Sequence, residues 1–562
     1  MSEQNTSGRR DFIRQLGLGS AGLAGAAALG ELDRSLLGQS VRRPNIVLVL
    51  ADDMGYSDLG CFGGEIDTPH LDRLAGRGLR FTHFHNAARC CPSRASLLTG
   101  LYPHQTGVGD MMNDGGVDGY RGDLNRRCVT IAEALRPAGY RSYAAGKWHV
   151  TRFLPPDGAR HNWPLQRGFD RYFGTITGAA SYYEPDTLLR DNEPIEPEPG
   201  SFLTDTITDR SVEFIRDHRR LHPNQPFFSY VAYTAPHWPL HAPDEEVAKQ
   251  RGRFDAGWDV LRERRYRRMI DLGIVDPRWA LSPRHRTVAA WAEAADKAWQ
   301  RRRMEVYAAQ VTQMDHGIGR LTAELEAQGV LDDTLILFLS DNGGCHEELT
   351  PSWENYLVRG RERVARPRTR AGRTVQFTND PAVMPGPDYT YQSYGYPWAN
   401  VSNTPYRLFK VSTHAGGINT PLIAHWPARI KSRGALRRQP GHLADVMATC
   451  LDVTGAAYPR TREGESVTPL EGRSLVPAFE NTTIARDSIC FEHEGHRAIL
   501  AGDYKLVANG AKSPWELYDV KADRTELSDL AATRPEMAER LAAQWTEWAA
   551  RTQVFPKPGT RA

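Results

Sequence analysis

Cysteine is scarce in this sequence: its 562 residues contain seven, an odd number, and only Cys90 and Cys91 are adjacent. The scattered spacing shows no disulfide framework, so at least one cysteine needs another explanation. The net charge is also small, at +2, which argues against a dedicated nucleic-acid binder. No segment holds the roughly 20 strongly apolar residues of a spanning helix, so we expect no stable membrane span. Internal repeats are absent as well.

The sequence contains enough hydrophobic residues to form a large folded core. Hydrophobic residues make up 40% of the chain and charged residues 25%, which is typical of a globular protein and not of a disordered or membrane-embedded chain. The length permits several domains, although α/β proteins often form one larger unit.

The N-terminal segment has the features of a targeting signal. Arg9 and Arg10 precede Phe12, Ile13 and a Gly/Ala/Leu run over 16–29, and together they resemble a twin-arginine export signal. A disordered tail is the alternative, and the run is too short and too rich in glycine for an anchor. We therefore expect 1–40 to be a signal region, the twin-arginine export machinery to be a partner, and the protein to be periplasmic or secreted.

Four apolar runs each end in polar residues. The pairs of run and polar group are 46–50 with Asp52 and Asp53, 141–145 with Lys147 and His149, 227–233 with His237, and 335–339 with Asp341 and Asn342. Such runs are typical of strands buried on both faces of a parallel sheet, and helical segments alternate with them. Because ligands of open α/β sheets bind beyond the carboxyl ends of the strands, we expect these polar groups to meet in one crevice.

The predicted fold is therefore α/β, with a large, mostly parallel central sheet flanked by helices. We assign 41–485 to this catalytic-type domain, with a charged helical region over about 242–325 and an irregular rim insertion over about 345–403. The arginines within 359–373 could attract an anionic substrate, but we interpret them as part of a solvated basic loop. The tail, 486–562, is predicted to be a smaller α+β domain, with short strands at 489–492, 504–507 and 516–518 and a helix at 535–548.

One segment carries the strongest signal. Residues 90–100, CCPSRASLLTG, resemble the sulfatase signature of cysteine, any residue, proline, serine and arginine, followed by leucine, threonine and glycine. The resemblance implies an alkaline-phosphatase-like fold and oxidation of Cys90 to formylglycine by a maturation enzyme. Independently, Pro92 and the small residues after it predict a helix that begins near Cys90, where amide donors favour anions. The alternative is a buried core cysteine or a partner for Cys91.

The two acidic pairs offer only oxygen ligands. Asp52, Asp53, Asp341 and Asn342 suit a hard cation such as Ca²⁺ or Mg²⁺ better than zinc. Either pair alone would also fit an ordinary turn or helix cap. The sulfatase resemblance implies one Ca²⁺ ion, with the modified Cys90 as a further ligand.

Further segments match the family residue by residue. They are 51–55 (ADDMG), 146–149 (GKWH), 235–237 (APH), 340–343 (SDNG), and 403–405 (NTP) with Lys410, and the run 398–405 is most like bacterial arylsulfatases. A lone histidine or lysine at such a place is usually structural, but these occur together and in family order. One departure is Ala415, which stands where relatives commonly have glutamate and which puts the positioning of Lys410 in doubt.

The resemblance implies hydrolysis of a small-molecule or saccharide sulfate ester. A hydroxyl of the hydrated formylglycine at position 90 attacks sulfur, Arg94, Lys147 and Lys410 neutralise the sulfuryl oxygens, and His237, with Lys410, protonates the leaving oxygen. His149 then deprotonates the second hydroxyl and sulfate leaves. The alternatives are a phosphonate or phosphate monoester hydrolase of the same fold, and a non-catalytic metal-binding homologue in which Cys90 stays a thiol.

Overall fold

The computed structural model describes residues 43–360 and 363–559, so the predicted export signal lies outside the described residues. Four parallel strands form the middle of the main sheet: β3 (Arg141–Gly146), β7 (Phe227–Ala232), β1 (Asn45–Ala51) and β8 (Thr334–Ser340), adjacent in that order. All seven residues of β1 are buried. Ile46, Leu48 and Leu50 pack into the core on one face, and Val47 and Val49 into the core on the other. The predicted two-sided burial follows from this alternation.

The sheet contains 11 strands among the described residues. Its order is β12-β2-β11-β8-β1-β7-β3-β4-β5-β6, with β13 beside β2, and β11 is antiparallel to both of its neighbours. The outer strands are β2 (Leu79–His85), β4 (Arg171–Thr175), β5 (Leu188–Arg190), β6 (Glu193–Pro194), β11 (Asn419–His425), β12 (Ala435–Arg437) and β13 (Gly441–His442).

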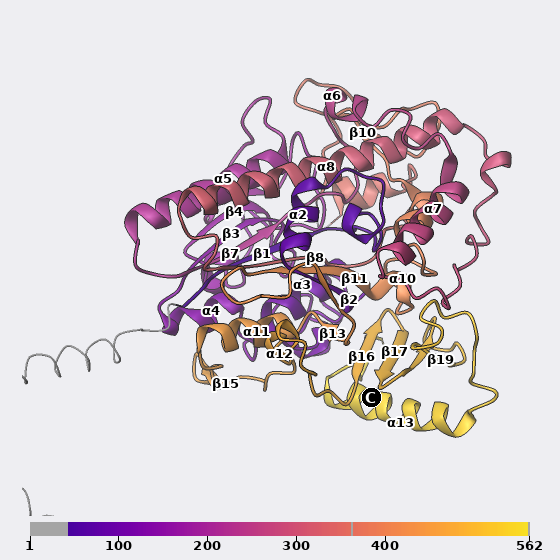
Figure 1. Cartoon of the computed structure of the whole chain (residues 1–562). Coiled ribbons are helices and arrows are strands. Elements are labelled where there is room, and N and C mark those ends of the chain that lie inside the picture. The colour runs from indigo at the N-terminus through magenta and orange to yellow at the C-terminus, as the bar shows by residue number, and fades with distance from the viewer. Residues whose placement is uncertain (1–42, 361–362, 560–562) are drawn as a thin grey trace, which may run out of the picture. The chain divides into compact units, whose positions relative to one another are not determined.

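Helices cover both faces of this sheet (Figure 1). One layer contains α2 (Pro69–Arg77), α5 (Leu203–Leu221) and α8 (Lys297–Ala327), which share a core with Val47 and Val49. The other contains α3 (Cys90–Thr99), α4 (Ile131–Leu135) and α11 (Asp445–Thr454), which share a core with Leu48. The predicted α/β class and its central sheet are confirmed.

The predicted helical region over 242–325 is wrong in its middle. The structure has α6 (Asp244–Ala248), α7 (Gly257–Asp271) and α8, and 272–296 are almost entirely irregular. Gly273 has a φ of +69°, and Pro277 and Pro283 lack the backbone N–H that a helix needs. These residues interrupt the continuous helical region that was predicted here.

The C-terminal part has its own antiparallel sheet, shown in yellow and orange in Figure 1. The strands are β16 (Ile489–His493), β17 (His496–Ala501), β18 (Tyr504–Ala508) and β19 (Glu516–Asp519), in that order, and α13 (Pro535–Arg551) packs Leu541 and Trp545 against them. Strand β17 was not predicted. The division at 486 into a separate domain stays a prediction.

The rim insertion is mostly irregular. It contains a short π-helix (Asn355–Arg359), β9 (Gln376–Phe377), β10 (Thr390–Tyr391) and α9 (Gly395–Ser402). Arg366, Arg370 and Arg373 form surface ion pairs with Asp186, Glu196 and Asp388, as expected of a solvated loop. Other short elements are α10 (Ala415–Ile418), α12 (Val476–Phe479), β14 (Thr461–Arg462) and β15 (Glu465–Ser466), and the single-turn 3-10 helices η1 (Gly60–Phe62), η2 (Pro103–Thr106), η3 (Arg136–Ala138), η4 (Pro164–Arg167) and η5 (Trp291–Glu293). Within the described ranges, no helix is both long and apolar enough to cross a membrane.

Candidate active site

The ten side chains predicted for the site lie together beyond the carboxyl ends of β1, β3, β7 and β8. Each is at most 3% exposed: Asp52, Asp53, Cys90, Arg94, Lys147, His149, His237, Asp341, Asn342 and Lys410. The parallel pairing of Ala51 with Ser340 brings the acidic pair after β1 beside the pair after β8. Asn342 Nδ2 donates to Asp53 Oδ1 at 2.7 Å, and the Asp53 backbone N–H donates to Asp341 Oδ1 at 3.2 Å.

Three basic groups neutralise the three carboxylates. Arg94 contacts Asp341 Oδ2 through Nε at 3.0 Å and Nη2 at 2.8 Å, and its Nη2 lies 3.5 Å from Asp52 Oδ2. Lys147 Nζ lies 2.6 Å from Asp52 Oδ2, and Lys410 Nζ lies 2.8 Å from Asp53 Oδ1. The acidic and basic charges of this cluster therefore balance before any ligand enters.

The two aspartates that follow β1 respond differently to burial. Burial and the charge of Asp341 raise the pKa of Asp52 well above its ordinary value. Burial also acts to raise the pKa of Asp53, but its electrostatic interactions with His237 and Lys410 outweigh burial and lower that pKa. Asp52 is thus the carboxylate that stands to gain most from an additional positive charge.

The oxygen donors fit a hard cation. Asp52 Oδ1 and Asn342 Oδ1 are buried and have no hydrogen-bond partner among the described residues. Buried acceptors of this kind normally have a partner, and carboxylate and amide oxygens are the ligands that Ca²⁺ takes. Asp52, Asp53, Asp341 and Asn342 are the residues that would hold it.

Cys90 is the first residue of α3, as predicted. Arg89, in an extended conformation, precedes the helix, and the Ser93 backbone N–H donates to its carbonyl. The Sγ atoms of Cys90 and Cys91 and a ring nitrogen of His149 lie within 4.8 Å of one another. A side-chain hydrogen bond with Cys91, together with the charge of Lys147, lowers the pKa of Cys90 well below its usual range, although burial opposes this shift.

His237 and Lys410 form one proton-holding pair. His237 Nδ1 lies 2.7 Å from the Trp238 carbonyl, so this nitrogen carries the ring proton, and Nε2 lies 3.3 Å from Lys410 Nζ. Burial lowers the pKa of His237 to about 3. Burial acts to lower the pKa of Lys410 too, but the charge of Asp53 outweighs it and raises that pKa. At neutral pH the proton therefore resides on Lys410.

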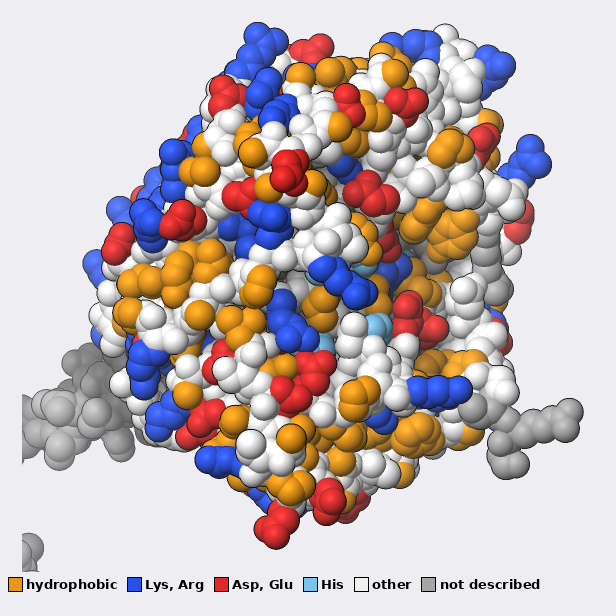
Figure 2. Space-filling model, turned by 90° about the vertical axis from the view of Figure 1, so that its right-hand side faces the viewer, with side chains coloured by type: hydrophobic (Ala, Val, Ile, Leu, Met, Phe, Trp, Pro, Cys, Tyr) orange, Lys and Arg blue, Asp and Glu red, His pale blue; other side chains and the backbone are white. Residues whose placement is uncertain are grey.

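A small pocket opens above these groups, and the residues of its wall were not predicted individually. Four of the predicted site residues line it: Cys90, His149, His237 and Lys410. Its other lining residues, which form its wall, include Met111, Trp238, Trp353, Tyr356 and Val364. Arg89 and Glu347 complete it as an ion pair 2.9 Å apart, and Glu347 Oε2 accepts a hydrogen bond from Trp238 Nε1 at 2.8 Å. Figure 2 shows a hollow in the middle of one face in which histidine side chains are visible.

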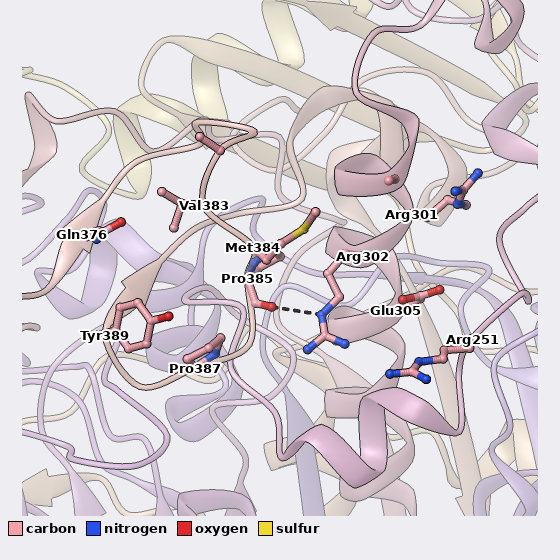
Figure 3. A pocket seen from close by; sticks show the side chains of 12 residues that line it. Arg251, Arg301, Arg302, Glu305, Gln376, Val383, Met384, Pro385, Pro387 and Tyr389 are labelled. Atoms are coloured by element: carbon pink, nitrogen blue, oxygen red, sulfur yellow. Dashed lines mark hydrogen bonds between the residues drawn. The ribbon is translucent and has the colours of Figure 1, made fainter.

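A second hollow lies elsewhere, beside α8 (Figure 3). Arg251, Arg301, Arg302 and Glu305 line one side, and the 382–389 segment, with Met384 and Tyr389, lines the other. It contains none of the ten predicted site residues.

A buried carboxylate from another segment contacts the backbone at Ala415. Glu526 Oε2 accepts a hydrogen bond from the Ala415 backbone N–H at 2.9 Å, and its other oxygen pairs with Lys505. Glu526 is 1% exposed, and the Lys410 loop leads directly into α10 at Ala415. This contact was not predicted from the sequence, because 111 residues separate the two positions.

Comparisons with known proteins agree with this geometry. The sulfatase family model matches residues 44–456, and a model described as N-sulphoglucosamine sulphohydrolase, C-terminal, matches 407–550. The chain is 32% identical over 548 residues to an uncharacterized sulfatase of Schizosaccharomyces pombe, covering 92% of this chain and 95% of that one. It is 32% identical over 465 residues to an arylsulfatase of Klebsiella aerogenes, covering 77% and 91%. The crystal structure of Ps i-CgsB superposes with a TM-score of 0.64 at 24% identity, covering 91% and 94%.

The fold and the comparisons thus define a hydrolase of the alkaline-phosphatase-like superfamily. Within that superfamily the chain belongs to the sulfatase family, and it is a sulfuric ester hydrolase.

Proposed function

We propose that the protein hydrolyses aryl-type sulfate monoesters through formylglycine at position 90 and one bound Ca²⁺ ion. The observation that carries this proposal is the helix-starting Cys90 beside a buried, charge-balanced cluster with two unpartnered oxygen acceptors. The proposed calcium would polarise a sulfate oxygen and stabilise negative charge on the nucleophile.

The charge balance of the cluster supports a monoanionic ester. Three carboxylates face Arg94, Lys147 and Lys410, so the protein contributes almost no net charge at this point. A divalent cation would leave two positive charges, which match one ionised nucleophile hydroxyl and one sulfate monoester. Arg94 and Lys147 would hold the sulfuryl oxygens while the new O–S bond forms and the ester O–S bond breaks.

Two different groups would carry the proton transfers. Lys410 carries a proton beside the acceptor nitrogen of His237, so this pair would donate to the leaving alkoxide or phenoxide. His149 lies beside Cys90, and Gly178 leaves no room for a Cβ, which would stand 2.4 Å from the imidazole ring. His149 would remove the proton from the second hydroxyl, so that the C–O bond to sulfate breaks and the aldehyde returns.

The pocket wall favours a flat, apolar leaving group. The Trp238 and Trp353 rings are T-shaped at 6.0 Å, and Trp353 and Tyr356 are T-shaped at 6.1 Å. The one ion pair of the wall, Arg89 with Glu347, is neutral overall. Aromatic walls of this kind bind ring faces, so an aryl ester fits better than a highly charged saccharide.

Maturation and transport complete the proposal. Oxidation of Cys90 requires a formylglycine-generating enzyme as a partner. The paired arginines at the N-terminus support export by the twin-arginine machinery to the periplasm or the medium.

The test compares turnover of an aryl sulfate with the matching aryl phosphate and phosphonate monoester. We expect the sulfate to have the highest kcat/KM, and preference for phosphorus would overturn the assignment. Cys90→Ser should release one equivalent of phenol and then stop, since a serine sulfate ester lacks the second hydroxyl that expels sulfate. Cys450→Ala, a buried cysteine in α11, is the matched control and should turn over normally.

A further inference from the structure

A second cluster of metal-ligating side chains lies where the C-terminal sheet meets the loop after α3. Strands β16 and β17 are joined by the two-residue turn Glu494–Gly495, with φ angles of +48° and +88°. Both positive angles are those of a tight hairpin turn, which fixes the side chains around it. His493 and His496 form the cross-strand pair that flanks this turn.

Three donor atoms from two distant segments of the chain converge at this turn. A carboxylate oxygen of Asp110, a ring nitrogen of His493 and a carboxylate oxygen of Glu494 all lie within 4.8 Å of one another. Ligands of a first-row divalent ion bind at about 2.0–2.2 Å, so donors around such an ion stand up to about 4 Å apart. Small side-chain movements would therefore enclose an ion.

The environment of His493 provides separate evidence for a bound cation. Its side chain is 0% exposed, and its Nδ1 has no hydrogen-bond partner among the described residues. Its Nε2 lies 3.5 Å from Glu494 Oε1, which is one of the other two donors. A buried imidazole normally has a partner, and a cation would satisfy it.

The donor types select a different ion from that of the active site. An imidazole with two carboxylates suits a borderline cation such as Zn²⁺, whereas the catalytic cluster offers only oxygens to a cation. His496 adds a second imidazole nearby, and its Nδ1 is also without a hydrogen-bond partner in the described part of the chain. Arg89 is the competing positive charge at Glu494, but it is held 2.9 Å from Glu347.

We propose that Asp110, His493 and Glu494 form a structural site for a Zn²⁺-class cation that fastens the C-terminal hairpin to the catalytic pocket. The Asp110 carbonyl lies 3.6 Å from the Cys91 thiol, which donates to it, and the next residue, Met111, lines the pocket. An ion here would therefore hold the loop that packs behind Cys90. The site stands whether or not Cys90 is oxidised.

The test titrates the metal-free, full-length protein with Zn²⁺ while Ca²⁺ is saturating, by calorimetry. Wild type should bind one Zn²⁺ equivalent, and His493→Ala and Asp110→Asn should each weaken that binding at least tenfold. Asp118→Asn, an exposed carboxylate on the same loop, and Asp341→Asn, in the catalytic cluster, should keep it. Asp110 is only partly buried, so its variant remains informative if His493→Ala fails to fold.

Co²⁺ provides a second readout, because its visible d–d bands respond to the ligands and the geometry around the ion. Those bands should appear in wild type and be lost in His493→Ala. Absence of Zn²⁺ binding in wild type, or equal binding by wild type, His493→Ala and Asp110→Asn, would overturn the proposal. Loss of binding only in Asp341→Asn would overturn it too, because it would place the ion in the catalytic cluster.

Discussion

Replacing Arg94 with lysine is expected to damage stability and catalysis together. Arg94 is fully buried, contacts Asp341 through two nitrogens, and donates to the Lys147 carbonyl at 2.9 Å. A lysine keeps the charge but has a single nitrogen, which cannot reproduce this fork. Breaking a buried pair outright costs about 3–5 kcal/mol, so Arg94→Ala should approach that loss of unfolding free energy and Arg94→Lys should lose less.

The catalytic loss has a separate cause. If Arg94 also holds a sulfuryl oxygen, its removal takes away one preorganised donor, which typically lowers kcat by about 10²–10³-fold. The assay measures kcat/KM for an aryl sulfate and urea unfolding on the same preparations with Ca²⁺ in excess. Arg167→Lys is the matched control, because Arg167 is equally buried and donates to Glu133 and to the Cys128 carbonyl, neither of which belongs to the predicted site.

Arg167→Lys should lose stability and keep kcat/KM. Should Arg94→Lys behave in the same way, with stability reduced and catalysis intact, Arg94 would be a structural residue and the proposed contact to sulfate would be wrong.

Three further predictions address the cation, the pocket wall and the C-terminal junction. Ca²⁺ at 100 times its Kd should raise the unfolding free energy by about 2.7 kcal/mol, and Asp341→Asn should abolish most of this response in chelator-controlled melts; an unchanged wild-type melting temperature would count against the cation site. Trp353→Ala should raise KM for an aryl sulfate several-fold with kcat little changed, and Trp353→Phe should restore it, since this side chain lines the pocket in which the proposed aryl leaving group would bind. A selective fall in kcat would contradict this role. Burial opposes ionisation of Glu492, but His104 at 2.8 Å and Lys557 at 2.5 Å outweigh it and lower its pKa from 4.5 to about 2. The resulting stabilisation, about 3 kcal/mol, should be complete above pH 4.5 and vanish as the pH falls towards 2, and Glu492→Gln should flatten that part of the stability profile; a parallel profile in the variant would refute it.

The sequence specified the middle of the fold well, for a physical reason. β1 and β8 are buried on both faces, so their apolar runs are uninterrupted and their ends are marked by Asp52 and Asp341. The place where the polar groups meet could also be predicted from these strand ends. The residues that follow neighbouring parallel strands lie at the same edge of the sheet. Strand β17 could not be predicted because it begins with the half-buried residues His496 and Arg497. Its sequence also lacks a regular alternation of apolar and polar residues.

The parts of the site that depend on distant contacts could not be predicted. Glu526 reaches Ala415 across 111 residues, and Trp353 enters the pocket from an irregular insertion without periodicity. The family motif identified Cys90, but only the fold shows His149 beside it. The roles of all ten residues in the reaction stay predictions until variants are assayed.

The mass of the tryptic peptide that contains residue 90 tests the central claim most directly. In active protein from a host with the maturation enzyme, the account predicts replacement of the Cys90 side chain CH₂SH by CHO, with Cys91 unchanged. A peptide carrying only the thiol at position 90, in a preparation with full sulfatase activity, would contradict it.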